Sequence, residues 1–178
     1  MAIKVVTDST ADLPPEVVRE WDICVVPLNV HFGDKTYKDG VTISADEFYQ
    51  KLAAAERLPT TSQPSVGEFL DVYRNLLDQG HQVLSVHISA KLSGTLNSAY
   101  QARDALLGKG RIEIVDSRQA SMSLGLIVLE AARAVKDGAT MDEALERVRK
   151  AVAETREFFM VDTLEYLEKG GRIGRAQA

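Results

Sequence analysis

One strand-like run that passes directly into a helical pattern constrains the fold of this chain most. Residues 83–88 are apolar and β-branched, and apolar residues recur at helical spacing from Leu96 to Leu106. Between the two patterns lie the small and hydroxylated residues Ser93, Gly94 and Thr95. A strand that delivers such residues to a helix start leaves free backbone N–H groups beside the positive end of the helix dipole. The stretch therefore predicts an anion-binding site.

The alternation of strands and helices continues along the chain. Strand-like apolar runs are expected at residues 3–7, 23–32, 83–88, 112–115 and 158–161. Pro27 divides the second run, and Gly33 with Asp34 predicts a tight turn after it. We expect an α/β fold with a mainly parallel sheet, helices on both faces, and a small antiparallel hairpin at its edge.

Three helices are predicted by capping boxes, in which a Ser or Thr is followed three residues later by Glu. The pairs are Ser44 with Glu47, Ser65 with Glu68, and Thr140 with Glu143. Other helices are expected at residues 14–21, 121–135 and 163–169. Between the first two boxes, residues 59–65 form a polar stretch bracketed by prolines, which predicts a loop.

Composition limits the function classes. There are 26 acidic and 21 basic residues, and the net charge of −5 argues against nucleic acid as a partner. No apolar run approaches the roughly 20 residues of a membrane span. The single cysteine, Cys24, cannot form an internal disulfide and lies in an apolar run, which favours a structural thiol in a cytoplasmic protein. No Cys/His cluster has metal-ligand spacing, so no metal site is expected.

Three expected strands end in an acidic residue followed by a hydroxylated one, at Asp8, Asp116 and Asp162. Such an acid can bind Mg²⁺ or act as a nucleophile in phosphoryl transfer. The same residue types also satisfy free N–H groups at turns and helix starts. No second acid follows Asp8 at Asp-x-Asp spacing, which favours the structural interpretation.

Ser93 has two alternative roles. A nucleophilic serine needs a nearby base and usually a Gly-x-Ser-x-Gly turn, which is absent here. Of the three histidines, His87 stands closest along the chain. The non-covalent alternative is that Ser93 and its neighbours hold a carboxylate or phosphate. A hydrolase of esters or phosphoesters using Asp8, Asp116 or Ser93 stays the competing hypothesis.

A second hydroxyl cluster, Thr61 and Ser62, also precedes a helix start. The two clusters can clamp one anionic head group if the fold brings them together, and otherwise each is a helix-capping loop. Near the end of the chain, Arg172 and Arg175 add fixed positive charge within a glycine-rich stretch. That stretch follows a helix and lacks Gly-Lys-Ser/Thr, so it is not a nucleotide fingerprint.

Several short stretches, taken in order, form one recognisable pattern. They are residues 7–14, 26–30, 37–40, 61–65, 92–95, 115–117, 162–167 and 169–174. Together they resemble the DegV family, the bacterial fatty-acid-binding proteins, over nearly the whole chain. A single one of these motifs is weak, but their conserved order makes the resemblance specific.

The resemblance implies a non-catalytic lipid carrier without a cofactor. It implies a long-chain fatty acid in an apolar tunnel, with its carboxylate held by Thr61, Ser62 and Ser93 beside Gly94 and Thr95. Arg172 and Arg175 become candidate head-group or partner contacts. The family resemblance also implies presentation of the acid to an ATP-dependent fatty acid kinase subunit, which forms an acyl-phosphate. Transient contact with a membrane surface is compatible with this role.

The same resemblance sets the expected domain organisation. Family members continue past the glycine-rich motif into a second lobe, which covers the tunnel and adds a histidine and basic residues. We therefore expect residues 1–178 to form one DegV-type lipid-binding domain. Its N-terminal lobe would extend to about residue 155, and the start of the second lobe would follow from about residue 156.

Overall fold

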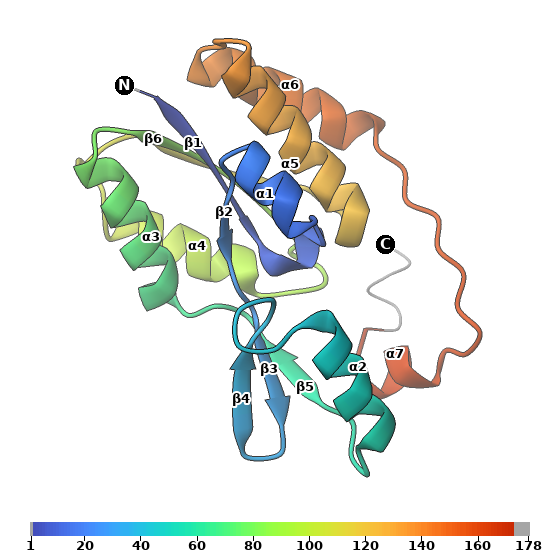
Figure 1. Cartoon of the computed structure of the whole chain (residues 1–178). Helices are drawn as coiled ribbons and strands as arrows, with labels where there is room; N and C mark the ends of the chain where they lie inside the picture. Colours follow the sequence, from blue (N-terminus) through green and yellow to red (C-terminus); the bar gives the residue numbers. More distant parts are fainter. Residues whose placement is uncertain (1, 173–178) are drawn as a thin grey trace.

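The computed structural model describes residues 2–172 and contains a four-stranded parallel sheet with helices on both faces (Figure 1). The strand order is β2-β1-β6-β7. The strands are β1 (Ile3–Asp8), β2 (Cys24–Val26), β6 (Gln82–His87) and β7 (Ile112–Asp116). Helices α3 (Val66–Asp78) and α4 (Thr95–Asp104) cover one face; η1 (Ser9–Ala11), α1 (Pro15–Glu20), α5 (Ser121–Lys136) and α6 (Met141–Glu154) cover the other. The predicted α/β architecture is confirmed.

Each face of the parallel sheet has its own apolar core. Val5 packs in the core under α5 and α6, whereas the next residue, Val6, packs under α3 and α4. Leu84 and Val83 divide in the same way. Consecutive strand residues point to opposite faces, so a strand covered on both sides can be apolar at consecutive positions. This is why Val5 is followed by Val6 on β1, and Val83 by Leu84 on β6.

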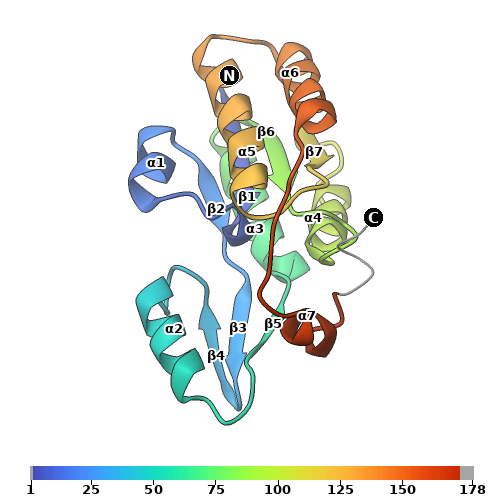
Figure 2. The same cartoon turned by 90° about the vertical axis from the view of Figure 1, so that its right-hand side faces the viewer.

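The antiparallel hairpin is present, but it belongs to a separate sheet (Figure 2). That sheet has the order β4-β3-β5, formed by β3 (Asn29–Phe32), β4 (Lys35–Lys38) and β5 (Thr60–Ser62). The chain leaves the parallel sheet at Pro27 and Leu28. Helix α2 (Ala45–Ala54) packs beside the hairpin, with the rings of Phe32 and Phe48 at 5.8 Å.

Strand β5 lies where a polar loop was expected. Its three residues are exposed and carry no apolar pattern. They form a strand because Thr61 pairs with Val30 and Ser62 pairs with Asn29 along β3. This pairing is made with the backbone of β3, which is far from β5 in the sequence, so the local pattern of residues 60–62 does not predict it.

All three predicted capping boxes are confirmed. At the start of α3, the Ser65 hydroxyl accepts the Glu68 N–H at 3.2 Å, and the Glu68 carboxylate accepts the Ser65 N–H at 2.8 Å. The same reciprocal bonds begin α2 at Ser44 and α6 at Thr140. Each box satisfies backbone donors that have no partner within the helix.

The strand expected at residues 158–161 is wrong. Residues 155–164 have no regular secondary structure and run outside the body of the molecule from α6 to α7 (Glu165–Lys169) (Figures 1 and 2). Phe158 and Met160 are 92% and 94% exposed. The run is apolar enough for a strand, but among residues 2–172 it finds no strand to pair with. Asp162 therefore ends no strand.

Candidate functional site

A pocket lies beyond the carboxyl ends of the parallel strands. From β1 the chain crosses to β2 on one side, and from β6 it crosses to β7 on the other, so ligands are expected at the point between β1 and β6. The pocket there has a volume of about 380 Å³. It is lined by Leu28, Thr61, Ser62, Gln63, Ala90, Leu92, Ser93, Gly94 and Arg172.

The fold brings together most of the predicted site residues. Thr61 and Ser62 on β5, Ser93 and Gly94 before α4, and Arg172 all line this pocket. Thr95 is buried instead, and its hydroxyl lies 2.9 Å from the Ser93 hydroxyl. Arg175 lies outside the described residues. The predicted carboxylate contacts of these groups stay a prediction.

The loop before α4 lies against the side chain of Gln63, the residue after β5. A Cβ atom placed on Gly94 would lie 2.6 Å from both terminal atoms of the Gln63 side chain. The absence of a Cβ at Gly94 therefore leaves room for Gln63 between the two hydroxyl clusters that line the pocket. Gln63, Leu28, Ala90 and Leu92 were not predicted as site residues, because their sequence positions carry no chemical signal of a ligand.

Ser93 lies in a tight loop that leads into α4. The Ser93 N–H donates to the Ser89 carbonyl at 3.1 Å, and the Ser93 hydroxyl accepts the Thr95 N–H at 3.3 Å. The N-cap of α4 is Gly94, which has no side chain to bond the first turn. The hydroxyl of Ser93 thus lies at the start of a helix, as the sequence predicts, and the binding of an anion there stays a prediction.

Ser62 is held by two side chains of β3. The Asn29 side-chain amide donates to the Ser62 hydroxyl at 3.2 Å, and the His31 Nε2 lies 3.0 Å from the same oxygen. Sequence reasoning did not identify Asn29 or His31. Their signal is the i, i+2 spacing that places both on one face of a strand.

A fully buried polar network was also missed. The His87 Nδ1 lies 2.9 Å from the Asp8 carboxylate, and its Nε2 lies 2.7 Å from the Ser85 hydroxyl. The Tyr73 hydroxyl lies 2.8 Å from Ser85. Asp8, Ser85, His87 and Tyr73 are each 0% exposed. Polar residues at i, i+2 inside an apolar strand are the sequence signal, since they share one face.

The network shifts the pKa of both acidic groups in it. Burial acts to raise the pKa of Asp8, but the hydrogen bond and charge of His87, with bonds from Thr10 and Ile88, leave that pKa below its ordinary value. Burial raises the pKa of the Tyr73 hydroxyl well above its ordinary range. Asp8 is thus held as an anion and Tyr73 as a neutral phenol at neutral pH.

This geometry does not favour the hydrolase alternative. Ser85, His87 and Asp8 are arranged like a hydrolytic triad, but no substrate can reach a fully buried Ser85. Both nitrogens of His87 are engaged inside the network, so His87 is not a base for Ser93. Asp116 accepts the Arg118 N–H at 2.8 Å, which is the turn role expected from its position.

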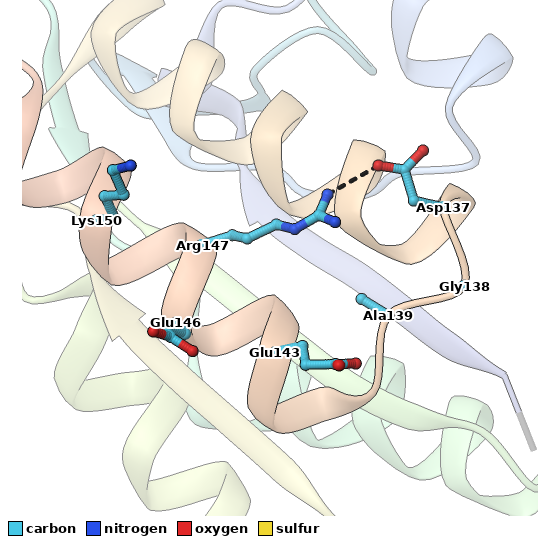
Figure 3. Close-up of a pocket in the computed structure, with 7 residues that line it drawn as sticks. All are labelled: Asp137, Gly138, Ala139, Glu143, Glu146, Arg147 and Lys150. Atoms are coloured by element: carbon cyan, nitrogen blue, oxygen red, sulfur yellow. Dashed lines mark hydrogen bonds and ion pairs between the residues drawn. The ribbon is translucent and has the colours of Figure 1, made fainter.

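A second hollow, of about 480 Å³, lies at the turn between α5 and α6 (Figure 3). Arg147 reaches across it to Asp137 at 2.8 Å, and the Glu143 carboxylate is bonded to Thr140 in the capping box of α6. Its lining residues are Asp137, Gly138, Ala139, Glu143, Glu146, Arg147 and Lys150. No predicted site residue lies here, so the hydroxyl-lined pocket is the better candidate.

Three other features bear on function within residues 2–172: the single thiol, the possible metal ligands, and the length and apolarity of the helices. Cys24 is half-buried, and burial raises the pKa of its thiol, which disfavours a nucleophilic thiolate. Residues 2–172 contain no group of three or more side chains placed to hold a metal ion. Within the same residues, no helix has the length and apolarity needed to cross a bilayer.

Comparison with known proteins identifies the family. The model for an uncharacterised protein of the DegV family matches residues 2–178. The chain belongs to the DegV family. A DegV domain-containing protein from Caldanaerobacter subterraneus is 40% identical over 176 residues, which cover 99% of this chain and 62% of that protein.

Two solved structures share the fold and are described by their lipid binding. A fatty-acid-binding DegV family protein from Thermus thermophilus has a TM-score of 0.90 and 41% identity, and the match covers 99% of this chain and 62% of that chain. A stearic acid-binding protein from Eubacterium ventriosum has a TM-score of 0.91 and 37% identity, and the match covers 98% of this chain and 61% of that chain. The chain therefore spans less than two thirds of the length of these relatives.

Proposed function

We propose that this chain binds a long-chain fatty acid, with the carboxylate in the pocket of Ser93. The proposal rests on one observation. Thr61 and Ser62 line the same pocket as Ser93 and Gly94, although the two pairs lie far apart in the sequence. Arg172 adds a positive charge at the same place. The fatty-acid-binding descriptions of the Thermus and Eubacterium relatives support this ligand class.

The physical chemistry of a fatty acid suits such a site. Burial of each methylene contributes ~0.8 kcal/mol, so a tail of about sixteen carbons contributes on the order of 10 kcal/mol before the costs of binding. Leu28 and Leu92 give the pocket an apolar side on which the tail can begin. The hydroxyl and N–H donors orient the carboxylate, which would be costly to bury without partners.

Palmitate titration of the purified chain tests this proposal, together with native mass spectrometry of the protein as isolated. We expect a co-purified fatty acid, saturable palmitate binding, and about tenfold weaker binding by Ser93→Ala because a bond to a charged group is lost. Thr140→Ala is the matched control. It removes the cap of α6 far from the pocket, so it should lower stability and leave the affinity unchanged. Absence of both lipid and palmitate binding would contradict the proposal.

The proposed role of the bound acid is presentation to a partner. We propose a non-catalytic carrier in the cytoplasm that offers the carboxylate to an ATP-dependent fatty acid kinase subunit for acyl-phosphate formation. Hydroxyl and N–H donors support this role because they leave carboxylate oxygens accessible. Transfer of labelled phosphate from ATP to palmitate should require both proteins. Equal transfer without this chain would show that it is not the carrier.

A further inference from the structure

The hydroxyl of Ser62 stands at the end of an ordered series of polar side chains. Glu68 on α3 forms an ion pair with Lys38 on β4. The Lys38 ammonium donates to the Asn29 side-chain oxygen at 2.5 Å. The Asn29 side-chain nitrogen then donates to Ser62 at 3.2 Å and to the Gln63 carbonyl at 3.2 Å. We call Glu68, Lys38, Asn29 and Ser62 the outer chain.

The direction of the bonds in the outer chain is set by Lys38. An ammonium group can only donate, so the Asn29 atom that faces it must be the oxygen. The amide nitrogen of Asn29 is therefore the atom that faces Ser62. The Ser62 oxygen accepts this bond, which occupies one of its two lone pairs and leaves its own proton without a partner in the outer chain.

His31 is the remaining neighbour of the Ser62 hydroxyl. Its Nε2 lies 3.0 Å from Ser62, and its Nδ1 lies 2.9 Å from the Thr36 hydroxyl. If Nε2 carries a proton, it donates to the second lone pair of Ser62. If Nε2 is bare, it accepts the Ser62 proton and turns that proton away from the pocket. The state of one nitrogen therefore decides what Ser62 can offer a ligand.

We propose that Asn29 and His31 are positioning residues that direct the Ser62 proton into the pocket, where Ser62 donates to a carboxylate. The inference rests on the proposed fatty-acid binding and names the groups that regulate it. Neither residue lines the pocket, so both act through Ser62. When both lone pairs of the Ser62 hydroxyl accept hydrogen bonds, its proton remains available for donation to the ligand.

The neighbours of His31 across the antiparallel sheet carry no charge. On β4 it pairs with Thr36 and on β5 with Thr60, both neutral. The Thr36 hydroxyl can donate its proton to Nδ1, and the ring proton then sits on Nε2, where it is donated to Ser62. We therefore expect the tautomer with the proton on Nε2, which leaves the Ser62 proton to be donated to palmitate.

Five variants and palmitate titrations at neutral pH test the inference. Asn29→Asp keeps the size of the side chain but places an acceptor against Ser62, and we expect about tenfold weaker binding. His31→Leu removes the N–H that is offered to Ser62 and should weaken binding about threefold, whereas His31→Gln keeps an N–H and should bind nearly as tightly as wild type. Asn75→Asp on the outer face of α3 and His81→Gln at the opposite end of β6 are the matched controls, and both should behave as wild type.

The outcomes separate the inference from the function on which it rests. If wild type binds palmitate and both Asn29→Asp and His31→Leu bind it as tightly as wild type does, the inference is wrong and the function stands. The same holds if these variants act equally in a Ser62→Ala background. If wild type takes up no palmitate, the proposed function fails. Nitrogen NMR of His31 needs no ligand and should show a protonated Nε2 at neutral pH; a bare Nε2 overturns the inference by itself.

Discussion

Two polar clusters in this molecule each place a histidine beside a serine, yet their surroundings differ. His87 and Ser85 lie wholly inside the parallel sheet layer, whereas His31 and Ser62 lie on the exposed antiparallel sheet. A buried polar group must find its partners within the protein, and the inner network is accordingly complete. The outer chain ends at the pocket with a hydroxyl proton still to be donated. Similar chemistry thus supports folding in one place and, we propose, binding in the other.

The largest effect is expected from Asp8→Asn in the inner network. The Asp8 carboxylate accepts bonds from the Thr10 N–H at 3.1 Å and from the Ile88 N–H at 3.1 Å, besides the His87 contact. An asparagine must turn its NH₂ toward one of these donors. We expect the free energy of unfolding to fall by about 3 kcal/mol in urea titrations. Asp116→Asn, at the half-buried end of β7 where the carboxylate accepts the Arg118 N–H, is the control and should cost less than about 1 kcal/mol.

The loss of stability at acidic pH provides a second test of the buried cluster. Since the pKa of Asp8 is lowered in the folded state, its ionised form stabilises the protein at neutral pH. That contribution is lost as pH falls below the ordinary aspartate range, near pH 4, toward the folded-state pKa. Asp8→Asn should therefore flatten the fall in stability below about pH 4. An unchanged slope would show that another carboxyl group controls acid unfolding.

A smaller loss is expected from Tyr73→Phe at the other end of the network. The substitution removes the hydroxyl that contacts Ser85, but Ser85 keeps its bond to His87. We expect a cost of about 1–2 kcal/mol in the same urea titrations. Tyr49→Phe on the exposed side of α2 should cost almost nothing. A Tyr73→Phe protein as stable as wild type would mean that the inner network contributes little as a unit.

Features that depend on residues close together in the sequence were predictable, whereas features that depend on long-range strand pairing were not. The capping boxes at Ser44, Ser65 and Thr140 depend on residues three apart, so spacing alone reports them. The contact between Asp8 and His87 joins residues 79 positions apart and exists only because β1 pairs with β6. No local pattern contains that information.

The two wrong secondary-structure predictions, at residues 158–161 and at β5, also result from long-range strand pairing. Residues 158–161 have the apolarity of a strand but no neighbouring edge in the described chain, whereas β5 has a neighbouring edge but no apolarity. The hydroxyls of the pocket were predicted from their positions before helix starts and through the family resemblance. Their support by Asn29 and His31 was not, because it depends on the face of β3 that the antiparallel pairing turns toward Ser62.

The smallest effect on stability, and the sharpest contrast with Asp8, is expected from Lys38→Met. Lys38 and Glu68 are each 31% exposed, so loss of their ion pair should cost at most about 1 kcal/mol. Without the ammonium, only the bond to the Gln63 carbonyl still orients the Asn29 amide, and Ser62 then meets the amide oxygen part of the time. We expect palmitate affinity to fall about threefold while stability hardly changes, which is the opposite of Asp8→Asn. Lys150→Met on the far helix α6 should change neither quantity. If Lys38→Met instead lost as much stability as Asp8→Asn at unchanged affinity, the outer chain would be a second folding network, and the contrast between the two clusters would fail.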